Sequence, residues 1–171
     1  MKLKNKNNGL TLLELLMVVG IAAVISVSAL VFFQSTDESS KVAREVSNIS
    51  MLSSGISNIY QQQGSYDGVN NAVIVASATL PDNMRGPGGN IKSPWKADGV
   101  TITPARINST SYMDSFTITY TAVPDRACVD MVTKTYTSFH ETVVNGVAIT
   151  SVPAATTECS NSDSNEISWT K

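Results

Sequence analysis

Residues 8–33, which read NGLTLLELLMVVGIAAVISVSALVFF, decide the fold of this chain. From Leu10 to Phe33 the run is apolar, and the residues that interrupt it are Thr11, Glu14, Gly20, Ser26 and Ser28. A helix rises ~1.5 Å per residue, so a helix of this length spans a hydrocarbon layer of ~30 Å. The sequence therefore predicts a transmembrane helix over residues 10–33.

The short segment before this helix sets its orientation. Residues 1–9 contain Lys2, Lys4 and Lys6 and no acidic residue, and basic flanks stay on the cytoplasmic side of a membrane. Everything after Phe33 is therefore expected on the opposite side. The alternative is removal of the run as an ordinary secretory signal peptide, cut near residues 26–28, but the apolar run continues past that point.

Glu14 is the fifth residue of the apolar run. An unpaired carboxylate inside a membrane costs about 2.5 kcal/mol or more, so such an acid by default has a partner and a function. No basic residue lies between Leu10 and Phe33, and the partner would have to come from elsewhere. The alternative is that Glu14 lies near the lipid headgroups and is only solvated there.

The segment Asn-Gly-Leu-Thr-Leu-Leu-Glu at residues 8–14, followed directly by the apolar run, resembles the class III leader junction of type IV pilins and their pseudopilin relatives. In that family a prepilin peptidase cuts after the glycine, which implies cleavage after Gly9 and N-methylation of Leu10. The glutamate that is fifth after the cut corresponds to Glu14. Because this cut is cytoplasmic, the resemblance implies a single-pass subunit held in the inner membrane before assembly, with its C-terminal domain in the periplasm.

Further residues resemble the type IVb major pilins, the group of bundlin and the toxin-coregulated pilin. The residue after the cut is not Phe, Ala127-Cys128-Val129 is followed by a second cysteine at Cys159, and residues 80–83 read LPDN within a loop rich in glycine and proline. The leader, residues 1–9, is shorter than is usual in that group. A type II secretion pseudopilin and a minor pilin therefore stay open as alternatives.

The helical period continues beyond Phe33. Apolar residues recur at intervals of three and four, which predicts a buried stripe formed by Val42, Val46, Ile49, Leu52, Ile56 and Ile59. Charged residues cluster where the helix would leave the membrane, namely Asp37, Glu38, Lys41, Arg44 and Glu45. We expect one helix from about Leu10 to Gln63, with residues 34–63 as its amphipathic half and Gly64 as its C-cap.

The remaining sequence predicts a connecting loop and then strands. Residues 64–99 are rich in turn formers and surround a short apolar piece, so they are interpreted as a loop. Residues 116–122 alternate apolar residues with threonine, as in a half-buried strand. Residues 143–149 contain Asn-Gly between valines, which predicts a hairpin with a type I′ turn. Residues 100–103 and 166–170 are predicted as further strands.

A short helix is expected between these strands. Asp125 is predicted to cap it, and Val129, Val132 and Tyr136 are predicted to be buried by it. Residues 100–171 would then form an antiparallel sheet that packs on the rear half of the long helix. The predicted fold class is α+β, with residues 34–171 as one globular domain.

Cys128 and Cys159 both follow the membrane segment and would lie in an oxidising compartment. We expect them to be paired, which would stabilise the domain by about 3 to 4 kcal/mol on the chain-entropy model. Two buried free thiols are the alternative. A metal site is less favoured, because His140 is the sole histidine and no acid or further cysteine stands at ligand spacing. No cofactor motif is present.

Composition excludes several function classes. Charged residues make up 15% of the 171-residue chain, whereas 22 Ser and 17 Thr give a largely neutral polar surface, so nucleic acid binding is not predicted. Outside residues 1–9 the chain has 9 basic and 14 acidic residues, a formal charge of −5. Phosphate loops, nucleophile elbows and His-Glu-x-x-His motifs are missing, so the chain is not predicted to be an enzyme.

A helix that is apolar on every side must be covered by lipid or by copies of itself. We therefore expect a helical homopolymer in which Glu14 pairs with the Leu10 amine of a neighbouring subunit. The resemblance implies that this polymer is a surface pilus. Gly20 would weaken the helix locally and allow bending, or serve as a helix contact. The resemblance implies prepilin peptidase and the inner-membrane assembly machinery as partners. The remote alternative is a membrane-anchored periplasmic enzyme or receptor.

Overall fold

The computed structural model of the chain describes residues 11–159 and 164–171, apart from the side chains of residues 30–35. The chain divides into two compact units, Met1–Glu38 and Ser39–Lys171. Helix α1, Leu12–Tyr60, begins in the first unit and ends in the second.

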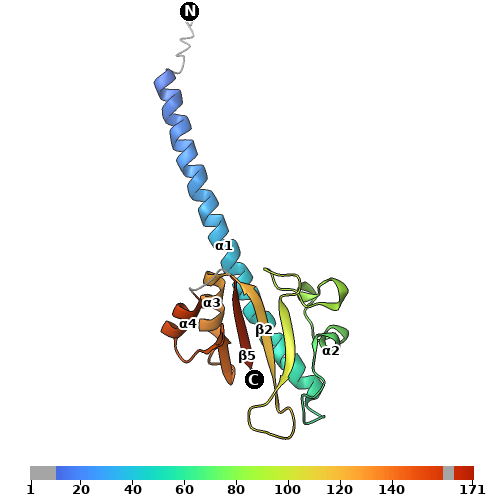
Figure 1. The fold of residues 1–171 in the computed structure, drawn as a ribbon. Coiled ribbons are helices and arrows are strands. Elements are labelled where there is room, and N and C mark those ends of the chain that lie inside the picture. The colour runs from blue at the N-terminus through green and yellow to red at the C-terminus, as the bar shows by residue number, and fades with distance from the viewer. Residues whose placement is uncertain (1–10, 160–163) are drawn as a thin grey trace, which may run out of the picture. The chain divides into compact units, whose positions relative to one another are not determined.

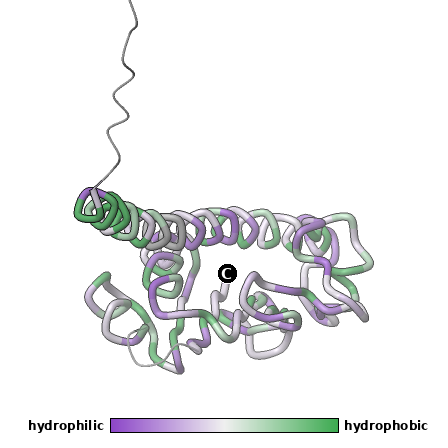
Figure 2. The backbone as a smooth tube through the Cα atoms, turned by 90° about the horizontal axis from the view of Figure 1, so that it is seen from above, coloured by the Kyte–Doolittle hydropathy of each residue, from purple (hydrophilic) through white to green (hydrophobic). Residues whose placement is uncertain are grey.

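The first unit contains the apolar part of α1. Residues Leu12–Ala29 have a mean hydropathy of 2.4, so this part of the helix is long and apolar enough to cross a membrane. Figure 2 shows this as a run of hydrophobic residues along the first turns of α1. Leu10, where the helix was predicted to begin, lies outside the described residues.

In the second unit, α1 buries most of the predicted stripe. Val42, Ile49, Leu52 and Ile56 are fully buried. Ile59 is 40% exposed, which corrects the prediction, because Tyr60 takes the next buried position four residues after Ile56. The helix ends at Tyr60 and not at Gln63, since residues 61–64 form a turn in which the Gly64 N–H donates to the Tyr60 carbonyl at 3.3 Å.

Five strands form one antiparallel sheet, with the order β1-β2-β5-β3-β4. The strands are β1, Val100–Ala105; β2, Ser115–Val123; β3, Glu141–Val144; β4, Val147–Ala148; and β5, Asn165–Thr170. The predicted strands and the α+β class are confirmed. Asn145 and Gly146 have φ values of 50° and 87°, as the predicted type I′ turn requires.

The two faces of the sheet differ in chemistry. One face is buried and contributes Phe116, Ile118 and Tyr120 from β2, and Ile167 and Trp169 from β5, to the core. The other face carries the alternating threonines and serine of β1, β2 and β5, which are exposed or half-buried. This pattern is the one expected of an antiparallel sheet covered on one side.

Residues 64–99 are more ordered than the connecting loop that the sequence predicted. They contain helix α2, Asn71–Ala76, and two 3₁₀ turns, Asp82–Met84 and Pro87–Gly89. The Asn70 side chain caps α2 by accepting the Val73 N–H at 3.1 Å, a signal that the sequence analysis missed.

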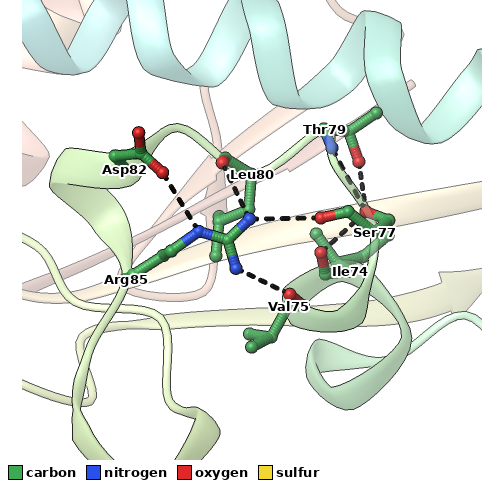
Figure 3. Close-up of polar contacts among 7 residues, drawn as sticks. All are labelled: Ile74, Val75, Ser77, Thr79, Leu80, Asp82 and Arg85. Carbon is green, nitrogen blue, oxygen red and sulfur yellow. Dashed lines mark hydrogen bonds and ion pairs between the residues drawn. The ribbon is translucent and has the colours of Figure 1, made fainter.

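The Arg85 side chain binds the C-terminal end of α2 (Figure 3). Its guanidinium donates to the carbonyls of Val75 at 2.8 Å and Ser77 at 3.2 Å, and to Asp82 Oδ1 at 3.3 Å. The Ser77 hydroxyl also bonds with that of Thr79. These bonds satisfy carbonyls at the end of α2, which a short helix leaves open.

Asn71 closes the outer edge of β1. Its side-chain amide donates to the Val100 carbonyl and its Oδ1 accepts the Ile102 N–H, both at 2.8 Å. The amide thus makes the pair of bonds that a further strand would make. At the opposite edge of the sheet, β4 is only two residues long.

Two helices, α3, Asp125–Thr135, and α4, Val152–Cys159, pack side by side (Figure 1). Asp125 was predicted to cap α3, but the cap position belongs to Pro124, and the Asp125 carboxylate instead accepts a hydrogen bond from Asn165 at 3.0 Å. Val132 is buried as predicted, while Val129 and Tyr136 are half-buried. Helix α4 was not predicted, although Ser151 accepts the Ala154 N–H at 3.4 Å as a cap.

Candidate functional site

The start of α1 places Glu14 in its first turn. The Thr11 hydroxyl accepts the Glu14 N–H at 3.3 Å, so Thr11 caps the helix and Glu14 stands at the third position after the cap. The Thr-x-x-Glu spacing is that of a capping box, a signal that the sequence analysis missed. Glu14 is exposed, so a local helix-capping role must be separated from a role in assembly.

Large apolar side chains surround the first part of α1, on both sides of Glu14 in the sequence. They are between 54% and 78% exposed, and they are Leu12, Leu13, Leu15, Leu16, Met17, Val18, Val19, Ile21, Val24, Ile25 and Val27. The hydroxyls of Ser26 and Ser28 donate to carbonyls four residues earlier, at 2.8 and 2.9 Å, so they need no outside partner. This surface is unsuited to water and requires lipid or other helices.

Of the remaining residues of the predicted N-terminal site, Gly20 is the one that the structure describes. Gly20 lies within α1, and in the described part of the chain no heavy atom would come within 4 Å of a side chain added there. Gly20 is therefore not needed for packing within one subunit. Gly9 and Leu10 lie outside the described residues.

A buried carboxylate joins α1 to the sheet. In the sequence, Glu45 belongs to the cluster of charged residues expected where the helix leaves the membrane, but Glu45 is only 2% exposed. It accepts the Tyr120 hydroxyl at 2.9 Å and the Asn48 amide at 2.9 Å. Its position, three residues after Val42 and four before Ile49, is a stripe position, and this was the signal for burial.

Burial raises the pKa of the Glu45 carboxyl from its ordinary value of 4.5, against the opposing effects of Tyr120, Asn48 and Arg44. Burial also raises the pKa of Tyr120 well above 10.0, and the adjacent Glu45 carboxylate adds to this. A carboxyl whose pKa is higher in the folded than in the unfolded chain stabilises the fold in its protonated form. This contribution is complete at pH values below the pKa of the unfolded chain, and it is lost as the pH rises through the pKa of the folded chain. The wild type should thus lose stability above about pH 4.5, and Glu45→Gln should not show this loss.

Replacing Tyr120 by Phe is expected to lower the free energy of unfolding by about 1.5 to 3 kcal/mol, because the buried carboxylate loses a donor. Urea unfolding of the detergent-solubilised chain at pH 7 measures this loss. The matched control is Tyr112→Phe, since Tyr112 is 49% exposed. Equal stability of the two variants would contradict a structural role for the Glu45 hydrogen bond.

The disulfide between Cys128 and Cys159 is formed, as predicted, with the two Cα atoms 5.6 Å apart. It connects α3 to the end of α4, and both cysteines are fully buried. The described residues include no free cysteine. The bond therefore closes the region that contains α3, the β3–β4 hairpin and α4.

Asn165 organises the inside of this region. Its buried Nδ2 lies 3.1 Å from the Val123 carbonyl, 3.0 Å from Asp125 Oδ1 and 3.2 Å from the Cys159 carbonyl. Its Oδ1 accepts the Asn145 amide at 2.8 Å. One side chain therefore connects β2, α3, α4 and the hairpin turn, and nothing in its sequence context marks it.

The α3–α4 surface contains a cavity of about 330 Å³ lined by Asp125, Arg126, Val129, Asp130 and Thr156. Groups of three or more potential metal ligands are not found among the described residues. His140 is exposed, and its N–H donates to the Thr170 carbonyl at 2.9 Å. Trp169 is fully buried and packs in the core.

Comparison with known families decides the assignment. A family model described as PilS N terminal matches residues 39–171, and one described as the prokaryotic N-terminal methylation motif matches residues 4–30. The chain belongs to the PilS N-terminal family. Its similarity to type IVb pilins, first suggested by residues 8–14 and the cysteine pair, is confirmed for this PilS-family chain.

Two relatives and two structures are similar to the PilS-family chain. The major structural subunits of the bundle-forming pilus from Escherichia coli O127:H6 and O111:H- are each 28% identical over 111 residues, which is 63% of this chain and 57% of the relative. The chain thus matches little more than half the length of these relatives.

The two solved structures share the type IV pilin fold. The type IVb pilin of Salmonella typhi is 22% identical, with a TM-score of 0.56 over 74% of this chain and 97% of that one. TcpA, a type IV pilin of Vibrio cholerae El Tor, is 13% identical, with a TM-score of 0.59 over 77% of this chain and 99% of that one.

Proposed function

We propose that this chain is the major structural subunit of a type IV pilus and polymerises through the apolar part of α1. The observation that carries the proposal is the large exposed apolar surface of the first part of α1, which lies within the matched methylation motif of residues 4–30. Outside lipid, such a surface is stable only when other helices cover it. A bundle of identical helices at the centre of a filament provides this cover.

Glu14 and the Leu10 amine would fix the register of the bundle. After cleavage, Leu10 carries the new amino terminus, a cation that one subunit would bring beside Glu14 of its neighbour. A buried ion left alone is strongly unfavourable, whereas a well-paired one is tolerated. Gly20 would provide either local bending of the helix or a close helix contact.

In the proposed pathway the subunit occupies two locations, one before and one after assembly. The chain first crosses the inner membrane once, with its C-terminal domain in the periplasm, where the Cys128–Cys159 bond is stable. Prepilin peptidase then cuts it, and the inner-membrane assembly machinery transfers it to an extracellular filament. The named relatives are major structural subunits of the bundle-forming pilus, and we extend lateral association of filaments to this chain.

Replacing Gly9 by a bulky residue such as Phe should leave the chain uncut, because the peptidase would meet a side chain where it requires none. The expected product is a membrane species that is larger by the leader, residues 1–9. Mass spectrometry of sheared filaments should find N-methylated Leu10 at the start of the wild-type chain. Exported wild-type protein that begins at Met1 would contradict the proposal.

Shearing and gene deletion separate this function from its rivals. The wild-type chain should be the abundant subunit of long filaments released by shearing, and deletion should abolish them without affecting secretion of other proteins. A chain that stays in the inner membrane, and whose loss blocks secretion, would instead be a pseudopilin. A chain whose loss changes neither would be an anchored monomer.

A further inference from the structure

The exposed face of the sheet carries a regular set of hydroxyl groups, here termed the hydroxyl array. Strand register aligns its members in two rows across β1, β2 and β5. The first row consists of Thr101, Thr119 and Ser168, and the second of Thr103, Thr117 and Thr170. Each strand thus contributes a pair of residues separated by one core residue.

The hydroxyl array is held rigid by its own hydrogen bonds. The hydroxyls of Thr117 and Thr170 are 2.9 Å apart, and those of Thr119 and Ser168 are 3.0 Å apart. Threonine is also restricted at χ1 because it is β-branched. Since a hydroxyl donates one hydrogen bond and accepts two, each group keeps capacity for an outside partner. A preorganised surface loses little entropy on contact.

The charges around the hydroxyl array make it complementary to a second copy of itself. Its six members are neutral, whereas the chain outside residues 1–9 has 9 basic and 14 acidic residues. Glu141 lies beside Thr170 on β3. Beyond the first row, the Lys96 Nζ lies 3.5 Å from the hydroxyl of Thr121 on β2. The same Nζ lies 3.7 Å from Asp98 Oδ1. A two-fold rotation would place Lys96 of each copy near Glu141 of the other.

We propose that the hydroxyl array is the surface through which neighbouring filaments bind each other, face to face with the same array on a second filament. The inference rests on the proposed pilus function and identifies the surface through which one filament contacts the next. The array lies on the sheet face opposite Tyr120, which bonds to Glu45 of α1. If α1 packs at the filament centre, the hydroxyl array faces outward, away from that centre.

The size of the hydroxyl array makes a single contact weak. Three strands ~4.8 Å apart and two rows ~6.8 Å apart cover on the order of 200 Å², whereas a stable interface buries about 800 Å² per partner. A filament presents the same array on every subunit, so many weak contacts act together. Filaments should bundle, and released subunits should not dimerise through this face.

Lysine substitutions in the two rows test the contact in intact filaments. Thr101→Lys and Thr103→Lys are suitable because both threonines are exposed on the edge strand β1. The matched control is Thr156→Lys, at an exposed threonine of α4 beside the α3–α4 cavity. Electron microscopy of sheared filaments measures filament number and bundle width at 0.1 M and 1 M NaCl.

Both array variants are expected to form filaments of normal number that lie singly at 0.1 M NaCl, because like charges then face each other. Bundles should return at 1 M NaCl, where the screening length falls from about 10 Å to about 3 Å. Thr156→Lys should bundle as the wild type does. Wild-type bundling by either array variant would overturn the proposal, as would loss of bundles in Thr156→Lys alone. Absence of filaments from the wild type would refute the pilus function instead.

Discussion

Glu14→Ala is expected to abolish filaments while leaving the chain inserted in the membrane and cleaved after Gly9. In the proposed helix bundle the carboxylate pairs with the Leu10 amine of a neighbouring subunit, so its loss would leave that amine buried without a partner. Breaking a buried ion pair in this way costs about 3 to 5 kcal/mol, which corresponds to at least a 100-fold loss of assembled subunits. Immunoblots of sheared and membrane fractions, in cells without a wild-type copy, measure both pools.

Glu14→Gln separates the ion pair from the capping of α1. Glutamine fits the third position of a capping box as well as glutamate does, but it has no charge to pair with an amine. We expect Glu14→Gln to fail in assembly as Glu14→Ala does, and Thr11→Ala, which loses only the cap at 3.3 Å, to assemble. Normal piliation of Glu14→Gln would show that Glu14 serves only its own helix.

The second large effect is expected for Cys159→Ser. The disulfide closes a loop with a sequence separation of 31 residues, and the chain-entropy model gives about 3.7 kcal/mol for a loop of that length. The unfolded fraction should rise about 500-fold, so periplasmic proteases should lower the level of the subunit. Immunoblotting of whole cells measures this loss.

Two further variants, Cys128→Ser and the double variant Cys128→Ser/Cys159→Ser, control for differences in expression between strains. All three remove the same bond, so all three should reach similar levels, and non-reducing peptide mapping should find the linked pair only in the wild type. Wild-type levels of all three would show that the buried contacts of α3 and α4, including the Asn165 hydrogen bonds, hold this region without the disulfide.

Local patterns in the sequence were sufficient to predict the main elements. The apolar run of residues 10–33 predicted the first part of α1 because it is long enough to span a membrane as a helix, and the stripe after it predicted the second part because it follows the period of a helix. Threonine alternation predicted β2, and Asn145-Gly146 predicted the hairpin, because turn geometry depends on the residues within the turn. The expected disulfide followed from the presence of two cysteines beyond the membrane segment.

Contacts between distant residues were not predictable in this way. Glu45 was grouped with the charges expected where the helix leaves the membrane, and its burial was not predicted because its hydrogen-bond partner, Tyr120, is 75 residues later. Asn165 and Asn71 resemble any loop asparagine in the sequence, and only the fold brings their amides to backbone groups of other elements. Helices α2 and α4 were missed because each is short and depends on a cap rather than on a long apolar period.

The amide of Asn71 also has a consequence for the proposed pool of subunits in the membrane before assembly. An open strand edge is a template for pairing with another chain, and such pairing leads to aggregation. With Asn71 occupying the Val100 and Ile102 backbone groups and β4 only two residues long, neither edge offers a long template. If subunits accumulate before assembly as proposed, these short or occupied edges would disfavour their growth into amyloid-like sheets.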